Sequence, residues 1–122
     1  MPHPTYYLLH VADPLASAAF YEQILGVAPV ETAPTFSLFV LEGGVKLGLW
    51  SKATVEPATA GAPGGSEIGI AVKAPAEVDA VAAAWDKFSP TILQAPVDMD
   101  FGRSFMIADP DGHRIRVFAV TG

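Results

Sequence analysis

The 122-residue chain contains no cysteine, which excludes disulfides, thiolate metal sites and a cysteine nucleophile. Charge is also scarce: 16% of the residues are charged, and 13 acids against 7 basic residues give a net charge of −6. Without a basic run, the chain does not suit nucleic-acid phosphates. It lacks both a signal-peptide pattern and any apolar run near the roughly 18 residues that span a bilayer. We therefore expect a cytoplasmic protein that binds neither nucleic acid nor membrane.

Apolar residues, by contrast, are abundant, at 51% of the chain. A chain of this length fits one domain, residues 1–122, with a core of moderate size. There are too few charged residues to cover the whole surface of such a domain. Part of the apolar surface is therefore expected to be buried against a second copy. The composition therefore favours a homodimer.

The first half of the chain carries signals for a strand, a helix and two further strands. Residues 6–12 predict a strand, and Asp13-Pro14 then supplies a helix N-cap followed by proline at the first helical position. The helix is expected to end at Gly26. Residues 36–41 and 45–50 predict two strands joined by a glycine-rich hairpin turn.

The same order recurs in the second half, where a third strand follows the helix and its two strands. The pattern predicts a strand over 67–72, a helix over 76–88, and strands around 92–97, 103–108 and 113–120. A repeat of this kind indicates an α+β fold of two βαβββ modules. The expected boundaries are about 6–51 for module 1, about 52–65 for the linker and about 66–120 for module 2.

Two short motifs fall within this pattern, "FYEQILG" in the first helix and "IADPDGHRIRVF" in the last hairpin. With them the chain resembles the glyoxalase, bleomycin-resistance and dioxygenase superfamily, which has the vicinal oxygen chelate fold. The stretches "SEIGI" and "FGRSFMIADPDGH" are similar to its phenazine-antibiotic resistance members. The resemblance implies curved mixed sheets around a cavity, completed in a dimer that is either domain-swapped or side by side.

Metal-dependent members of this superfamily hold their metal with His and Glu at four strand positions. By this resemblance the four positions fall at Tyr6, Gly48, Glu67 and Arg116. Glu67 alone can bind a divalent ion, whereas Arg116 places a fixed positive charge there, and a working site needs about three N or O ligands. We therefore expect a metal-independent protein with no cofactor.

Strand alternation selects the residues that face the cavity in the first module. If Gly43-Gly44 forms a two-residue turn, Phe39 lies opposite Gly48 and Ser37 lies opposite Trp50. Glycine within a strand leaves space on that face, so an aromatic ring beside Gly48 suits a flat ligand.

For the last hairpin, the apolar pattern favours a three-residue turn with Gly112 in the left-handed conformation. That register places Ser104 and Met106 beside Arg116 and sends the apolar residues to the helix side. The expected ligand-binding residues are therefore Tyr6, Phe39, Gly48, Trp50, Glu67, Ser104, Met106 and Arg116.

The resemblance favours a protein that sequesters a planar aromatic, phenazine-like antibiotic and so confers resistance without turnover. An alternative is a metal-free lyase or isomerase in which Glu67 is the base and Arg116 stabilises an oxyanion. A third reading is a structural dimer with an unused pocket, in which Trp50 is ordinary packing. The sequence assigns no role to His10 or Arg103 and does not identify the ligand.

Overall fold

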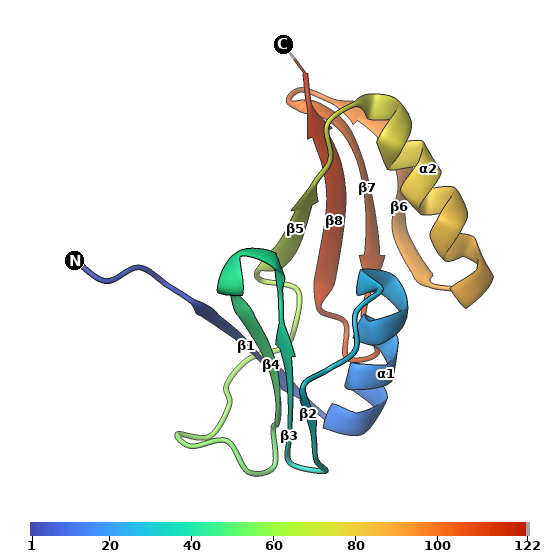
Figure 1. Cartoon of the computed structure of the whole chain (residues 1–122). Coiled ribbons are helices and arrows are strands. Elements are labelled where there is room, and N and C mark those ends of the chain that lie inside the picture. Colours follow the sequence, from blue (N-terminus) through green and yellow to red (C-terminus); the bar gives the residue numbers. More distant parts are fainter. Residues whose placement is uncertain (122) are drawn as a thin grey trace. The chain divides into compact units, whose positions relative to one another are not determined.

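The computed structural model describes residues 1–121, which form two compact units, one ending at Gly61 and the other beginning at Ala62. Each unit contains the element order βαβββ (Figure 1). The first consists of β1 (Tyr6–Val11), α1 (Pro14–Leu25), β2 (Glu31–Thr32), β3 (Phe36–Val40), the 3₁₀ turn η1 (Glu42–Gly44) and β4 (Lys46–Ser51). The second consists of β5 (Glu67–Ala71), α2 (Pro75–Trp85), the 3₁₀ turn η2 (Asp86–Phe88), β6 (Thr91–Met99), β7 (Gly102–Ala108) and β8 (Arg114–Val120). The predicted α+β fold is confirmed.

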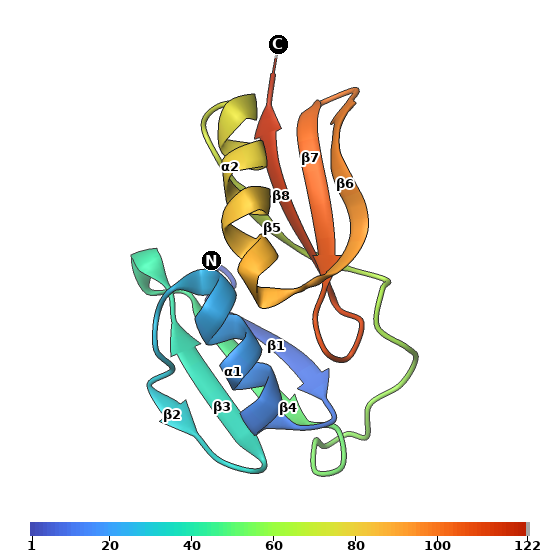
Figure 2. The same ribbon diagram turned by 90° about the vertical axis from the view of Figure 1, so that its right-hand side faces the viewer.

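Each unit has one mixed four-stranded sheet. The strand orders are β1-β4-β3-β2 and β5-β8-β7-β6. The pairs β1/β4 and β5/β8 are parallel, and the remaining pairs are antiparallel. In both units the helix covers one face of its own sheet (Figure 2), so the other face is left for a site.

Helix α1 begins and ends where its flanking residues predict. The Asp13 carboxylate accepts hydrogen bonds from the backbone N–H groups of Leu15 (3.0 Å) and Ala16 (3.3 Å), as an N-cap does. At the other end Gly26 adopts φ 70° and its N–H donates to the Glu22 carbonyl at 3.0 Å. The helix between these caps buries Ser17, Ala18, Tyr21 and Ile24, so its packed face runs over most of its length.

In the second unit, α2 packs on its sheet through a buried tryptophan. The Trp85 ring meets the Phe105 ring edge-on at 5.6 Å, and both side chains are buried. The helix ends at Trp85 and continues as the tighter turn Asp86–Phe88, so the predicted range 76–88 spans both elements. No helix among residues 1–121 is long and apolar enough to cross a membrane.

The last hairpin confirms the predicted register. The Asp109 N–H donates to the His113 carbonyl at 2.8 Å, which leaves a three-residue turn in which Gly112 has φ 99°. Consequently Met106 lies opposite Arg116 on one face. The apolar set on the other face is buried against α2, as expected: Phe105, Ile107, Ile115 and Val117.

The first hairpin departs from the prediction by one residue. The Leu41 N–H donates to the Val45 carbonyl at 2.7 Å, so three residues, not two, form the turn. Gly43 (φ 84°) and Gly44 (φ 85°) are both in the left-handed region, which admits this wider turn. Since side chains alternate between faces, a shift of one residue exchanges the two faces of β3.

The predicted position of Phe39 on the face of Gly48 is therefore wrong. Leu38 lies opposite Gly48, and Phe36 lies opposite Trp50. Ser37 points toward α1, where its hydroxyl donates to the Pro14 carbonyl at 3.0 Å. Phe39 is on the same side with 0% exposure, so it belongs to the core.

Candidate ligand-binding site

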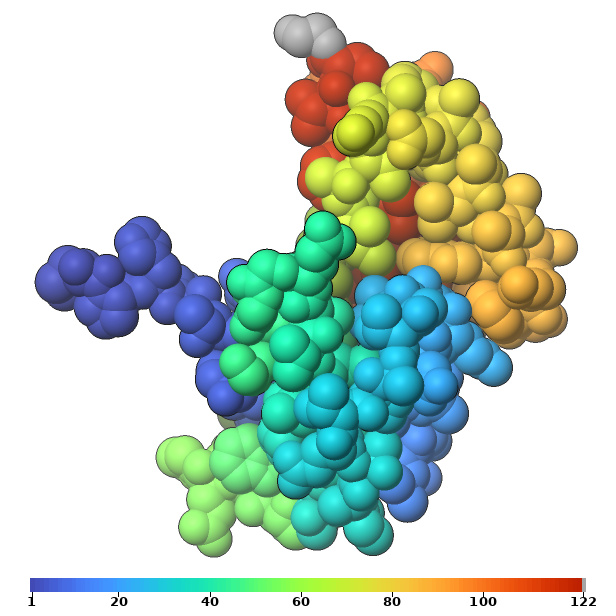
Figure 3. Space-filling model, in the orientation of Figure 1, coloured from blue at the N-terminus to red at the C-terminus, as the bar shows by residue number. Residues whose placement is uncertain are grey.

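The first sheet carries an aromatic hollow on the face that α1 leaves open. The hollow has a volume of about 410 Å³. It is lined by Tyr6 and Leu8 from β1, Phe36 from β3 and Trp50 from β4. The residues before β1 extend away from the body of this unit (Figure 3) and are exposed. The hollow is therefore open, and its lining is apolar. Such a surface suits the flat face of an aromatic ligand.

Gly48 is buried beneath two of the residues that line this hollow, Leu8 and Phe36. A Cβ atom at this position would lie 2.5 Å from Leu8 Cδ2 and 2.9 Å from Phe36 Cζ. The missing side chain therefore does not leave an empty space; it lets Leu8 and Phe36 lie directly on the sheet. Phe36 in turn meets Trp50 edge-on, with ring centroids 6.3 Å apart.

His10 contacts Trp50 on the side opposite Phe36. Its ring meets Trp50 edge-on at 6.5 Å, and its Nδ1 lies 2.6 Å from the Thr59 hydroxyl. Trp50 therefore stands between two rings, Phe36 and His10, which restrict its orientation. The sequence had left His10 without a role, because the contact with Thr59 spans 49 residues.

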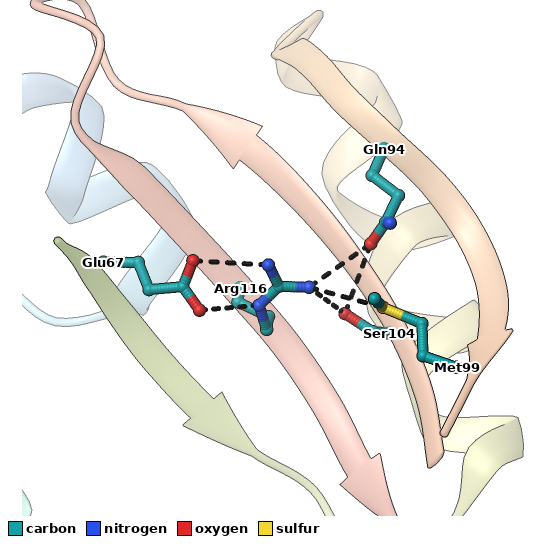
Figure 4. A network of polar contacts seen from close by, with 5 residues as sticks. All are labelled: Glu67, Gln94, Met99, Ser104 and Arg116. Atoms are coloured by element: carbon teal, nitrogen blue, oxygen red, sulfur yellow. Dashed lines mark hydrogen bonds and ion pairs between the residues drawn. The ribbon is translucent and has the colours of Figure 1, made fainter. Parts of the chain in front are cut away.

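The second sheet carries a polar network centred on Arg116 (Figure 4). Its Nε and Nη2 donate to the two Glu67 oxygens at 2.7 Å and 3.3 Å. Its Nη1 donates to Ser104 Oγ at 2.8 Å and to Gln94 Oε1 at 3.3 Å, and lies 3.7 Å from Met99 Sδ. The guanidinium is thus held in one orientation by groups from β5, β6 and β7.

This ion pair makes the Glu67 carboxyl more acidic than usual. The hydrogen bond from Arg116 lowers the pKa of Glu67; burial opposes the shift, and the charges of Arg116 and Arg114 add to the lowering. A carboxylate with a lowered pKa is a weaker base. The network therefore disfavours Glu67 as a general base.

We predict that Glu67→Gln destabilises the second unit more at neutral pH than in acid. The folded-state pKa of Glu67 lies below its ordinary value of 4.5, so the ion pair stabilises the fold above that value. This contribution disappears as the pH falls through the folded-state pKa. Because the Glu67 side chain is 39% exposed, solvent screening limits the effect to below about 1 kcal/mol.

The measurement is denaturant unfolding of both proteins at about pH 7 and about pH 3. Asp100→Asn, which removes an exposed loop carboxylate, is the matched control and should cost little at either pH. An equal loss from Glu67→Gln at both pH values would contradict the prediction.

The four positions that hold a metal in metal-dependent members do not fit a divalent cation here. Tyr6 lines the aromatic hollow, and Gly48 has no side chain. Both oxygens of Glu67 accept from Arg116, whose charge opposes a cation. Within residues 1–121 no group of three or more His, Asp or Glu side chains could hold a metal ion.

The structure brings the predicted residues together in two sets, one in each unit. Tyr6, Gly48 and Trp50 share the open face of the first sheet. In the second unit, Ser104 contacts Arg116 directly, while Met106 lies on the same face but is only 3% exposed. Phe39 joins neither set.

Four residues that line the hollow or contact Arg116 were not predicted from the sequence: Leu8, Phe36, Gln94 and Met99. Alternation from Tyr6 was sufficient to find Leu8, whereas Phe36 was lost with the hairpin register. The other two lie on β6, whose register shifts on both sides of Gln94. Such irregularities break the alternation on which a prediction depends.

Arg103, also unassigned by the sequence, has a structural role. Its Nε and Nη2 donate to the two oxygens of Asp79 on α2 at 2.9 Å and 3.0 Å. Its Nη1 donates to Asp98 on β6 at 3.0 Å, and these two carboxylates raise the pKa of Arg103. This side chain therefore joins the helix to the sheet and is not part of the site.

Comparison with known proteins identifies the fold and the family of this chain. The phenazine antibiotic resistance protein EhpR of Enterobacter agglomerans is 34% identical over 117 residues, covering 93% of this chain and 89% of the relative. A protein of Agrobacterium tumefaciens solved by NMR is 50% identical with a TM-score of 0.89, and all of both chains is covered. A glyoxalase-related enzyme from Fulvimarina pelagi is 25% identical with a TM-score of 0.82, covering 98% of this chain and 88% of the other. The family profile matches residues 3–117, and the chain belongs to the Glyoxalase/Bleomycin resistance protein/Dioxygenase superfamily.

Proposed function

We propose that this protein is a cytoplasmic, metal-independent binding protein that sequesters a planar aromatic, phenazine-like antibiotic. The observation that carries the proposal is the open hollow lined by Tyr6, Leu8, Phe36 and Trp50. Its three aromatic rings offer stacking and edge contacts, each of about 0.5–1.5 kcal/mol beyond the burial of area. Resistance would follow from stoichiometric capture of the drug.

Two further observations support the proposal. The relative EhpR is named a phenazine antibiotic resistance protein and aligns over 93% of this chain, which supports a role in antibiotic resistance. The pairing of Glu67 with Arg116 supports metal independence, because a guanidinium stands where a cation would bind. The same pairing argues against the alternative enzyme, since Glu67 is held ionised and engaged.

The homodimer expected from the composition is part of this proposal. Large apolar side chains remain exposed on both units, and a second copy would cover part of this surface. The most exposed of them in the folded strands and loops are Tyr6 (53%), Tyr7 (55%), Val30 (63%), Ile92 (52%) and Val120 (67%).

The test is a titration of the full chain with phenazines, quinones and bleomycin-type drugs, followed by tryptophan fluorescence. We expect saturable quenching by phenazines at about micromolar concentration, with one ligand bound per chain. The bound ligand, recovered and analysed by mass, should be chemically unchanged. No response to any member of the panel would overturn the proposal.

Product in molar excess over protein would instead favour the enzyme. In that case activity should disappear in Glu67→Gln, because this variant removes the proposed base while keeping the shape of the side chain.

A further inference from the structure

A lysine stands at the edge of the aromatic hollow. Lys46 lies beside Tyr6 in the parallel pairing of β1 with β4 and beside Val40 in the antiparallel pairing with β3. Paired residues project to the same face, so Lys46 shares the open face with Gly48 and Trp50. Its Nζ lies 5.2 Å from the centroid of the Tyr6 ring, and that ring lines the hollow.

The charge of Lys46 has no acidic partner in the described part of the chain. No carboxylate among residues 1–121 lies within ion-pair distance of its Nζ. Its contacts are the Tyr6 ring and a long hydrogen bond of 3.4 Å to the Gly44 carbonyl. Glu31 is exposed on the same face, but it lies on β2, two strands from β4.

The ammonium group is therefore available to a ligand. The side chain is half-buried, and the surface next to it is apolar. An attraction between charges is less screened beside an apolar surface than in open water. A carboxylate carried by a ring that lies in the hollow would also accept a charge-assisted hydrogen bond from Nζ.

Resting on the proposed function, the geometry points to planar aromatic anions as the preferred ligands of the hollow, with Lys46 selecting the anionic substituent. The overall charge of −6 would favour a cationic ligand instead. The local charge of Lys46 determines the preferred charge of the ligand, because exposed charges more than about 10 Å away are largely screened at moderate salt. The ligand class is thus a polycyclic aromatic acid whose rings contact Trp50 and whose carboxylate meets Lys46.

The test compares four tricyclic ligands of nearly the same shape. Phenazine-1-carboxylate is the anion, phenazine-1-carboxamide its neutral isostere, phenazine the unsubstituted ring and N-methylphenazinium the cation. Dissociation constants are measured by tryptophan fluorescence for the wild-type chain and for Lys46→Gln, Lys46→Arg and Lys52→Gln. Lys52, an exposed lysine just beyond the end of β4, is the matched control.

We expect wild type to bind the carboxylate about fivefold more tightly than the carboxamide. The ratio should fall toward about one in Lys46→Gln and in about 0.5 M salt, and persist in Lys46→Arg and Lys52→Gln. Retained binding of neutral phenazine shows that Lys46→Gln is folded.

Equal binding of carboxylate and carboxamide by wild type would overturn this inference while leaving the proposed function intact. A preference that survives in Lys46→Gln, or tighter binding of the cation, would do the same. If none of the four ligands binds, both the inference and the proposed function fail.

Discussion

Phe39→Ala is expected to lower the free energy of unfolding by about 3–5 kcal/mol, because it removes a fully buried ring. Phe36→Ala, three residues away on the opposite face of β3, should cost about 1 kcal/mol, since its half-buried ring contacts Trp50 and solvent. The expected effects on ligand binding are reversed. Phe36→Ala should weaken phenazine binding about tenfold, and Phe39→Ala should leave the affinity of the folded fraction nearly unchanged.

Denaturant unfolding measures the first pair of effects, and a fluorescence titration measures the second. The loss in Phe39→Ala is a large part of a typical total stability, so Phe39→Leu provides a milder variant of the same site, with a cost of about 1 kcal/mol. If Phe36→Ala destabilises the fold more than Phe39→Ala, the three-residue turn and the resulting register are incorrect.

Trp50→Ala is expected to weaken the binding of planar aromatic ligands by at least about 30-fold, or about 2 kcal/mol. Trp50 lines the hollow and is held between Phe36 and His10. A rigid, pre-oriented ring loses little freedom when a ligand stacks on it, so most of its contact energy appears as affinity. The fold should tolerate the change, because Trp50 is only half-buried.

Trp85→Phe is the matched control for this variant. The chain has two tryptophans, and Trp85 is buried against Phe105. The quenching caused by phenazine should therefore persist in Trp85→Phe and be lost in Trp50→Ala. Isothermal titration calorimetry measures the affinity of Trp50→Ala independently of its fluorescence. Unchanged affinity in Trp50→Ala would place the ligand outside the hollow.

Local signals in the sequence were sufficient to predict most of the fold. Asp13 and Gly26 bound α1 because capping depends only on residues adjacent in the chain. The register of the last hairpin was also predictable, because a two-residue turn would place Phe105 beside Arg116, whereas a three-residue turn places Phe105 beside Val117.

The strand β3 lacks such a signal. Its residues, "FSLFV", are apolar on both faces, so either register buries acceptable side chains. The register then depends on the turn, and two consecutive glycines accept a two-residue or a three-residue turn equally well. Choosing the shorter turn placed Phe39 in the site and excluded Phe36.

In the candidate site, too, some features follow from the sequence and others only from the tertiary structure. The sequence by itself determined the family motifs and the repeated βαβββ order, because both depend on residue identity and local spacing. The placement of Gly48 and Arg116 at metal-ligand positions follows from the resemblance that these motifs carry. Only the tertiary structure decided that Phe36 and not Phe39 lines the hollow, that Lys46 lies beside Tyr6, and that Gln94 contacts Arg116. The physical reason is that these contacts join strands distant in the chain, whose pairing is set by turn geometry and by the shifts in β6.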